Sequence, residues 1–425
     1  MIRHVPEEFI HYIWRLKLFD FSILKTTRLR PLQILDFGFH NPNAGPDFLD
    51  GKILLDGVTW IGHFEIHIKS SDWYKHRHHL DPNYDNVVLH IVMEEDRLVN
   101  RKDDTIIPCL NISRLIQKHS LKKYHSLKSS LDWVPCTNLI QDVPDITIKS
   151  TLERMIAERL ENKSIGISKK LKSCKYDWSE VIYKRLAWSL GLSVNADTFE
   201  ALAHSLPLRV VFREKDSLLK LEALLFGQSG LLPAGSREAY VQSLKKEYRI
   251  LRSKYKLNPI KAIMWKFSRL RPPSFPSFRI AQFAKILFRI DRLDQILSFS
   301  SREEIMEFFN FKLNGYWSNH YRFGIASSNT NVMLGHEKIN SILINAIAPL
   351  LFAYSKIYDV NSLRDRAITL LLTTPPEDNI IIRKWASLQI KANNAADTQG
   401  LIHLKKSYCS KGLCLNCSIG HKVLN

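Results

Sequence analysis

The sequence has few cysteines and no long apolar run. Its 425 residues contain six cysteines, which is too few for a disulfide-stapled scaffold. No stretch of about eighteen uncharged apolar residues occurs, and charged side chains interrupt the apolar ones near the N-terminus. Internal repeats and low-complexity tracts are missing as well. We therefore expect a cytoplasmic protein with no membrane partner, no signal peptide and reduced thiols.

The charge of the chain is strongly positive and unevenly distributed. The formal net charge is +19 at pH 7. Residues 1–100 carry 11 Lys and Arg against 14 Asp and Glu, so the remaining residues carry 50 against 28. Such a surface attracts polyanions, above all nucleic acid. Histidine has the opposite bias, because nine of the 16 lie in the first hundred residues, which indicates a site there.

The length and the hydrophobic patterning predict an α+β protein in three parts. A chain of this length exceeds what one hydrophobic core usually organises. We expect a small mixed sheet with flanking helices over residues 1–130 and a basic, mostly helical domain over 147–400. A short cysteine-rich segment follows over residues 401–425. The helical patterns in the second part cover residues 150–160, 178–190, 217–226, 237–254, 279–288 and 339–354.

The N-terminal part opens with an amphipathic helical pattern over residues 7–19 and continues with short extended runs. These runs cover residues 32–37, 52–55, 58–69 and 86–93. The Asp56-Gly57 pair predicts a tight hairpin between the second and third runs, because both central residues of the favoured turn need positive φ. In the third run, Glu65, His67 and Lys69 fall on one face.

Two carboxylates are expected to converge at one end of this hairpin. Asp47 precedes one strand and Glu65 lies in the adjacent antiparallel strand, so that both can reach one Mg²⁺ or Mn²⁺ ion. Such an ion lowers the pKa of a bound water and neutralises charge on a phosphate, with His67 or Lys69 assisting. The alternative is a half-exposed hairpin with a cross-strand salt bridge. Residues 72–81 form either a phosphate-contacting helix, a proton network or a polar surface helix.

Several segments together resemble a known family. They are residues 7–14, 43–48, 64–73, 84–90, 226–228, 269–272, 316–317 and 320–321, with the terminal cysteines. They are similar to an uncharacterised bacterial family, domain of unknown function 2851, over nearly the full length. This resemblance implies no established activity.

The N-terminal part alone also resembles the core of the PD-(D/E)XK nucleases. That resemblance places Asp47 at the Asp position and Glu65 at the acidic position of the motif strand, and Glu8 as an auxiliary acid. Where the nuclease pattern has lysine, this chain has His67, and Lys69 lies one strand repeat further on the same face. Either residue is a candidate to replace the missing lysine.

Three cysteines near the C-terminus have the spacing of metal ligands. Cys409, Cys414 and Cys417 suit thiolate ligation of Zn²⁺ or of an iron–sulfur cluster. A fourth ligand comes either from Cys136, which would tie the end of the chain to the N-terminal part, or from His421, which would complete a local site. The alternative is three free thiols.

Two lysine- and arginine-rich runs in the helical part are candidate nucleic-acid contacts. They supply Lys169, Lys170, Lys245, Lys246, Arg249 and Arg252. On helices such runs can follow a phosphate backbone, although most are simply solvated faces. The leading hypothesis is a metal-dependent nuclease-like enzyme. Its rivals are a non-catalytic nucleic-acid-binding or scaffold protein on a degenerate nuclease fold, indicated by the missing lysine, and a metal-dependent hydrolase of another anionic substrate.

Overall fold

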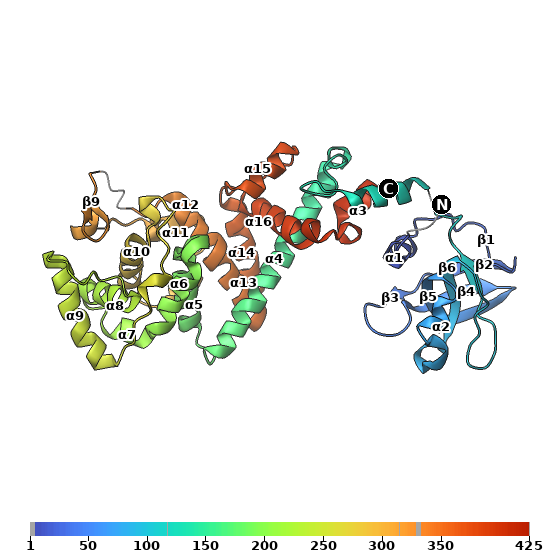
Figure 1. The fold of residues 1–425 in the computed structure, drawn as a ribbon, viewed down its shortest axis with the longest axis horizontal. Coiled ribbons are helices and arrows are strands. Elements are labelled where there is room, and N and C mark those ends of the chain that lie inside the picture. Colours follow the sequence, from blue (N-terminus) through green and yellow to red (C-terminus); the bar gives the residue numbers. More distant parts are fainter. Residues whose placement is uncertain (1–4, 117, 314, 329–332, 425) are drawn as a thin grey trace. The chain divides into compact units, whose positions relative to one another are not determined.

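The computed structural model describes residues 5–116, 118–313, 315–328 and 333–424. The chain divides into two compact units, whose elements are labelled in Figure 1. Unit 1 combines Met1–Thr151 with Lys405–Asn425, and unit 2 is Leu152–Leu404. The sheet belongs to unit 1 and unit 2 is mostly helical. The predicted α+β class is therefore confirmed.

Unit 1 is built on a seven-stranded mixed sheet with the order β1-β2-β4-β5-β6-β7, in which β3 pairs with β4. The pairs β5–β6 and β6–β7 are parallel and the others are antiparallel. The strands are β1 (Leu24–Lys25), β2 (Pro31–Asp36), β3 (Phe39–His40), β4 (Phe48–Leu55), β5 (Val58–Lys69), β6 (Val87–Glu94) and β7 (Cys109–Asn111).

The helical elements of unit 1 flank this sheet in sequence and are mostly short. They are α1 (Glu7–Arg15), α2 (Asp72–Lys75), η1 (His78–Leu80), η2 (Pro82–Tyr84), α3 (Lys118–Ser129), η3 (Ile140–Asp142), η10 (Cys409–Lys411), η11 (Cys414–Asn416) and α17 (Ser418–Leu424). Helix α4 (Asp145–Ser173) begins in unit 1 and continues into unit 2, and the π-helical turn η9 (Leu404–Tyr408) leads back.

The predicted hairpin between β4 and β5 is confirmed, with φ of 49° at Asp56 and 78° at Gly57. The opening helix is shorter than predicted, because Lys17 adopts a left-handed φ of 56° that ends it. Its last turn holds Trp14, whose ring contacts Phe64 with a centroid distance of 5.5 Å. Helix α1 is thereby fixed against β5, beside the polar residues of that strand.

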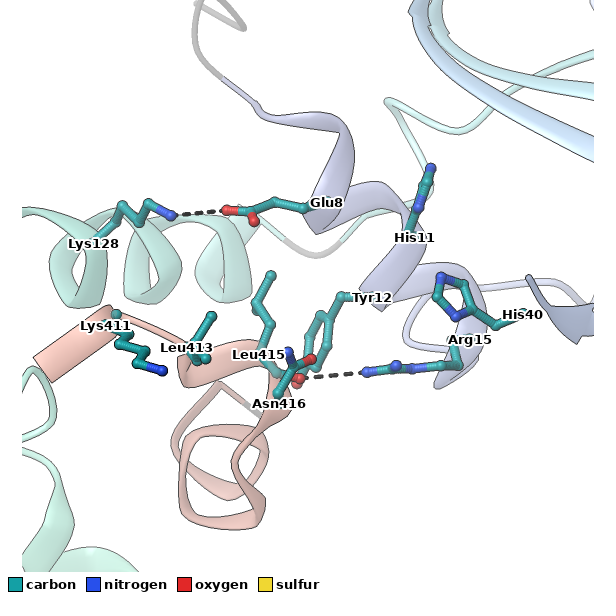
Figure 2. A pocket seen from close by; sticks show the side chains of 11 residues that line it. Glu8, His11, Tyr12, Arg15, His40, Lys128, Lys411, Leu413, Leu415 and Asn416 are labelled. Atoms are coloured by element: carbon teal, nitrogen blue, oxygen red, sulfur yellow. Dashed lines mark hydrogen bonds and ion pairs between the residues drawn. The ribbon is translucent and has the colours of Figure 1, made fainter. Parts of the chain in front are cut away.

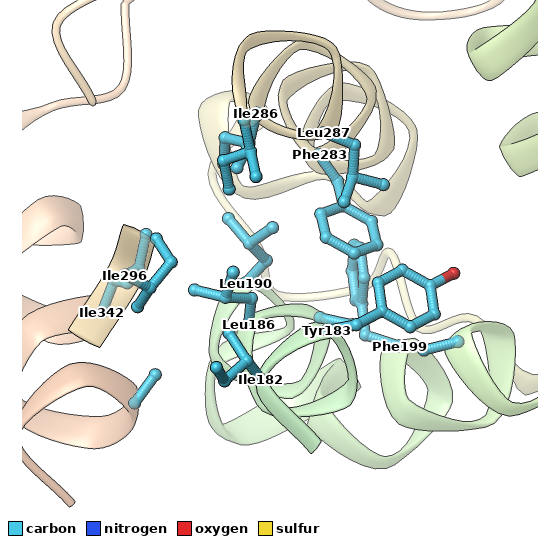
Figure 3. Packing of buried hydrophobic residues seen from close by; sticks show 14 of the residues in the cluster. Ile182, Tyr183, Leu186, Leu190, Phe199, Phe283, Ile286, Leu287, Ile296 and Ile342 are labelled. Atoms are coloured by element: carbon cyan, nitrogen blue, oxygen red, sulfur yellow. The ribbon is translucent and has the colours of Figure 1, made fainter. Parts of the chain in front are cut away.

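Unit 2 has a large apolar core built from many helices. Figure 3 shows part of it, where α5, α6 and α10 bring Tyr183, Phe199 and Phe283 together. The helices are α5 (Trp178–Leu190), α6 (Leu192–Ser205), α7 (Leu208–Arg213), α8 (Leu218–Ser229), α9 (Ala239–Tyr255), α10 (Pro276–Arg289), α11 (Arg302–Phe309), α12 (His336–Ile342), α13 (Ala348–Tyr358), α14 (Asn361–Thr373), α15 (Ile380–Ser387) and α16 (Ala395–His403). A short hairpin joins β8 (His320–Arg322) to β9 (Ile325–Ala326).

One helical run in unit 2 is long and apolar enough to cross a membrane. It covers His336–Tyr358, where α12 passes through a π-helical turn into α13. Inside the structure 67% of its most apolar window is buried. The packing of Ile342, Leu343 and Leu350 into the unit 2 core accounts for this apolar composition.

Candidate metal centre

The register of β4 and β5 places Asp47 opposite Glu65. Phe48 pairs with Phe64, so Asp47, one residue before β4, faces the next residue of β5. The Asp47 N–H donates to Glu65 Oε2 at 3.1 Å, and the Ile66 N–H donates to Asp47 Oδ2 at 2.9 Å. The two acidic residues that the sequence singled out are therefore hydrogen-bonded neighbours.

Glu65 and His67, two residues of the polar face of β5, are buried. Glu65 is 4% exposed and His67 is 1% exposed, and His90 from the parallel neighbour β6 is fully buried beside them. His67 Nδ1 lies 2.8 Å from His90 Nε2, so one of the two rings donates to the other. An alternating strand normally turns such a row of ionisable groups to solvent, and its burial here indicates a built site.

The segment that follows β5 supplies two more imidazoles. His76 ends α2 and His78 begins η1, and Arg77 between them has a left-handed φ of 64°. This reversal turns both rings toward β5. His76 Nδ1 lies 3.1 Å from His67 Nε2, and His78 Nε2 lies 3.2 Å from Glu65 Oε1.

Three imidazoles of this cluster lie close enough together to hold one metal ion, and the Glu65 carboxylate lies beside two of them. The ligand nitrogens of His67, His76 and His78 all lie within 4.8 Å of one another, and His67 Nε2 is 3.6 Å from Glu65 Oε1. Tetrahedral ligands at about 2.1 Å from a metal are about 3.4 Å apart. The separations of 3.1, 3.2 and 3.6 Å bracket that value. Three imidazoles and a carboxylate suit Zn²⁺ or Fe²⁺ better than Mg²⁺.

The electrostatics of the cluster favour a bound cation. Burial, with the adjacent charge of Asp47, raises the pKa of Glu65 to about 9. Burial, with the neighbouring imidazoles, lowers the pKa of His67 to about 2 and that of His90 to about 3. These histidines are therefore neutral at pH 7, the form that ligates metals, and a metal ion can replace the proton on Glu65.

Further side chains pack against the residues of this cluster. His11 Nε2 on α1 lies 3.3 Å from Asp47 Oδ2. Burial alone would lower the pKa of His11, but its contact with Asp47 and the charge of Asp47 raise it above the ordinary value. The Tyr84 ring stacks on the His78 ring with a centroid distance of 3.8 Å, and the ring centroids of Trp73 and His90 are 5.6 Å apart.

Two residues expected at the site lie elsewhere. Lys69 is half exposed and its Nζ is 3.6 Å from Glu94 Oε2, so His67, and not Lys69, lies beside Glu65. The Glu8 carboxylate accepts hydrogen bonds from Tyr124 and Lys128 on α3. Burial raises the pKa of its neighbour Glu7, on which the charges of His11 and Asp47 also act.

The sequence did not identify His11, His76, His78 and His90 as partners of the carboxylates. The signal was present, since nine histidines lie in the first hundred residues. Their grouping depends on the parallel β5–β6 register and on the reversal at Arg77. Neither can be read from hydrophobic periodicity.

A pocket of about 220 Å³ is lined in part by His11, the histidine that contacts Asp47. Figure 2 shows side chains of α1, α3 and the C-terminal segment around it, with Arg15 bound to the Leu415 carbonyl. Its cationic and imidazole lining is Arg15, Lys128, Lys411, His11 and His40. The acid in this pocket, Glu8, is already paired with Lys128.

The candidate nucleic-acid contacts are on two helices of unit 2. Lys169 and Lys170 lie on α4, and Lys245, Lys246, Arg249 and Arg252 lie on α9. Lys170 pairs with Glu200, and Lys245 donates to the Ala234 carbonyl. Lys169, Lys246 and Arg249 are exposed to solvent.

Comparison with known proteins identifies a family, but the description of that family names no activity. A family model described as "Protein of unknown function (DUF2851)" matches residues 7–380. The match includes the whole histidine and carboxylate cluster and ends before the C-terminal cysteines. No curated protein and no solved structure matches the chain.

Proposed function

Because the chain belongs to the DUF2851 family, whose description names no activity, its chemistry must be inferred from its own residues, and we propose a metal-dependent nuclease. One observation carries this proposal: His67, His76 and His78 are spaced as ligands of a single ion, and Glu65 lies beside two of them. Two further acids and a histidine of raised pKa surround them. This donor set fits hydrolysis assisted by Zn²⁺, Fe²⁺ or Mn²⁺.

The residues around the ligands have separate roles in the proposed reaction. A metal ion in such a site supplies a water of lowered pKa and neutralises charge on the attacked phosphate. Asp47 orients His11 and raises its pKa, which favours the protonated ring that can give a proton to the leaving oxygen. His90 fixes the ring of His67 through the 2.8 Å contact, as partners of metal-bound histidines commonly do.

The choice of nucleic acid as substrate has three supports. The pocket beside His11 presents Arg15, Lys128 and Lys411, which suit a phosphate group. The order of α1, an antiparallel hairpin, α2 and a parallel β6 is similar to the PD-(D/E)XK core. Beyond residue 100 the chain carries 50 Lys and Arg against 28 Asp and Glu.

The test is cleavage of labelled single-stranded DNA, double-stranded DNA and RNA by the full chain with Zn²⁺, Fe²⁺, Mn²⁺ or Mg²⁺. We expect cleavage that requires an added metal and that falls by about 10³-fold in His67→Ala and Glu65→Gln, because a ligand is lost. Two matched controls should stay near the wild-type rate. His79→Ala removes a neighbouring imidazole that packs on Tyr74, and Lys69→Ala removes the cation paired with Glu94.

Three outcomes would contradict the proposal. Cleavage at the wild-type rate by His67→Ala would mean that the cluster is not the active site. Tight metal binding without any cleavage would favour the non-catalytic nucleic-acid-binding alternative. Hydrolysis confined to small phosphoesters would favour a hydrolase of another anionic substrate.

A further inference from the structure

A separate cavity in unit 1 is lined by four of the six cysteines. Cys136 comes from the loop before η3, and Cys409, Cys414 and Cys417 come from the C-terminal segment. The cavity has a volume of about 20 Å³, close to that of one water-sized sphere. The other lining residues, Pro135, Tyr408, Leu413 and Gly420, bring no charge.

The local backbone is shaped to bring the thiols together. Gly412 has a left-handed φ of 65° and reverses the chain between η10 and η11. Gly420 on α17 approaches so closely that an added Cβ would lie 2.1 Å from the Cys414 carbonyl oxygen. The Cys417 N–H donates to that same carbonyl oxygen at 3.2 Å. Two short 3₁₀ turns and one helix are thus folded into a compact knuckle.

All four cysteines line this cavity, two of them buried and two partly buried. Cys136 is 8% exposed and Cys417 is 7% exposed. Burial, with the neighbouring thiols, raises the pKa of Cys136 to about 12 and that of Cys414 to about 11. A bound metal would stabilise the thiolate form of these cysteines.

We propose that Cys136, Cys409, Cys414 and Cys417 bind one thiolate-ligated metal centre, either a Zn²⁺ ion or an iron–sulfur cluster. The structure favours Cys136 over His421 as the fourth ligand. His421 does not line the cavity, and its Nε2 lies 2.6 Å from the Leu415 carbonyl oxygen. Its ring is 5.3 Å from that of Tyr12.

This centre joins two distant parts of the chain. Unit 1 is left after Thr151 and re-entered at Lys405, so a bond between Cys136 and the C-terminal trio closes a loop that contains all of unit 2. The same C-terminal segment forms a wall of the pocket beside His11 through Lys411 and Leu415. The metal would hold this wall in place, independently of the proposed nuclease activity.

The test is metal analysis of the full chain purified without chelator in a His67→Ala background, which removes a ligand of the histidine cluster. We expect about one zinc, or an iron–sulfur cluster seen by its visible absorption and acid-labile sulfide. Cys136→Ser should lose at least half of this metal. His421→Ala should retain it, and so should Cys174→Ser, whose thiol contacts Lys184 in unit 2. Removal of the metal should raise amide exchange in α17 and η3.

Two results would contradict the proposed cysteine metal centre. Less than stoichiometric metal together with four titratable thiols would overturn the proposal, and so would full metal retention in Cys136→Ser. If Cys136→Ser does not fold, X-ray absorption at the metal edge of the His67→Ala protein still identifies the atoms that ligate the metal. A shell of four sulfur ligands supports the centre, whereas a shell dominated by nitrogen and oxygen refutes it.

Discussion

At the scale of single residues, burial decides which protonation states this protein uses. Glu65 and His67 lie on one face of β5. Burial favours the neutral form of each, because it raises the pKa of Glu65 to about 9 and lowers the pKa of His67 to about 2. An isolated buried charge is costly, so a face of this kind is stable only when neutral or when bound to a cation. A metal ion satisfies both groups at once.

Glu214 in unit 2 shows the opposite behaviour and gives a test of stability against pH. It is 3% exposed, and its carboxylate accepts from Lys254 at 2.7 Å and contacts Lys220 at 3.2 Å. Burial alone would raise its pKa, but these lysines and the Tyr255 hydroxyl lower it to about 2. The folded state therefore binds the proton less tightly than the unfolded chain, whose carboxyl titrates near the ordinary value of 4.5.

Glu214→Gln should cost about 1–2 kcal/mol of unfolding free energy at pH 7, less than the full shift implies because the lysines are partly exposed. The contribution is complete above pH 4.5 and is lost as the pH falls toward 2. Urea denaturation of both proteins at several pH values measures this difference. A difference that stayed constant down to the lowest pH would show that the ion pairs do not stabilise the fold.

At the scale of elements, the reversal between α2 and η1 positions two of the proposed ligands. Arg77 holds a left-handed φ of 64°, which a β-branched residue adopts only at a cost of about 1–2 kcal/mol. The same reversal presents His76 and His78 to one point. Backbone conformation at Arg77, and not its side chain, should therefore control metal affinity.

Arg77→Val should weaken metal binding at the histidine cluster by about tenfold, while Arg77→Ala and Arg77→Gly should bind as the wild type does. Competition with a chromophoric chelator measures this affinity, and the His67→Ala protein provides the background from other sites. Equal affinity in Arg77→Val and Arg77→Ala would show that the turn does not position the ligands. Weak binding in all three variants would instead implicate the guanidinium.

At the scale of the whole molecule, charge and chemistry are separated along the chain. Residues 1–100 are slightly acidic and contain the histidine and carboxylate cluster, whereas the surplus of positive charge follows them. Lys246 and Arg249 lie exposed on α9. Because phosphate contacts release counterions, an exposed basic helix that binds nucleic acid makes the affinity depend on salt.

The double variant Lys246→Glu with Arg249→Glu should weaken binding of a labelled oligonucleotide by about tenfold or more and should lower the salt slope by about two. Reversing two exposed lysines of unit 1, Lys25 and Lys102, changes the net charge equally and should have less effect. Fluorescence anisotropy over a series of salt concentrations measures both quantities. Equal losses in the two double variants would show that only net charge matters.

The sequence by itself determined the local elements and the identity of the reactive residues. Alternation and the Asp56-Gly57 pair predicted β5 and its hairpin, and helical periodicity predicted α5 at its observed bounds. Asp47 and Glu65 do lie together, but the turn alone would set Asp47 opposite Ile66, and a bulge between Phe48 and Gly51 shifts the register by one residue. These are short-range consequences of spacing along the chain.

Only the tertiary structure decided which residues surround those carboxylates. His90 reaches His67 through a parallel strand pair that no local turn specifies. Cys136 and Cys417 line one cavity of unit 1, although all of unit 2 lies between them in the sequence. Glu8 pairs with Lys128 on α3 and so does not serve as the auxiliary acid that the sequence predicted. Such contacts depend on how distant elements pack, and packing is fixed by the burial of apolar surface over the whole unit, whereas periodicity reports only one face of one element.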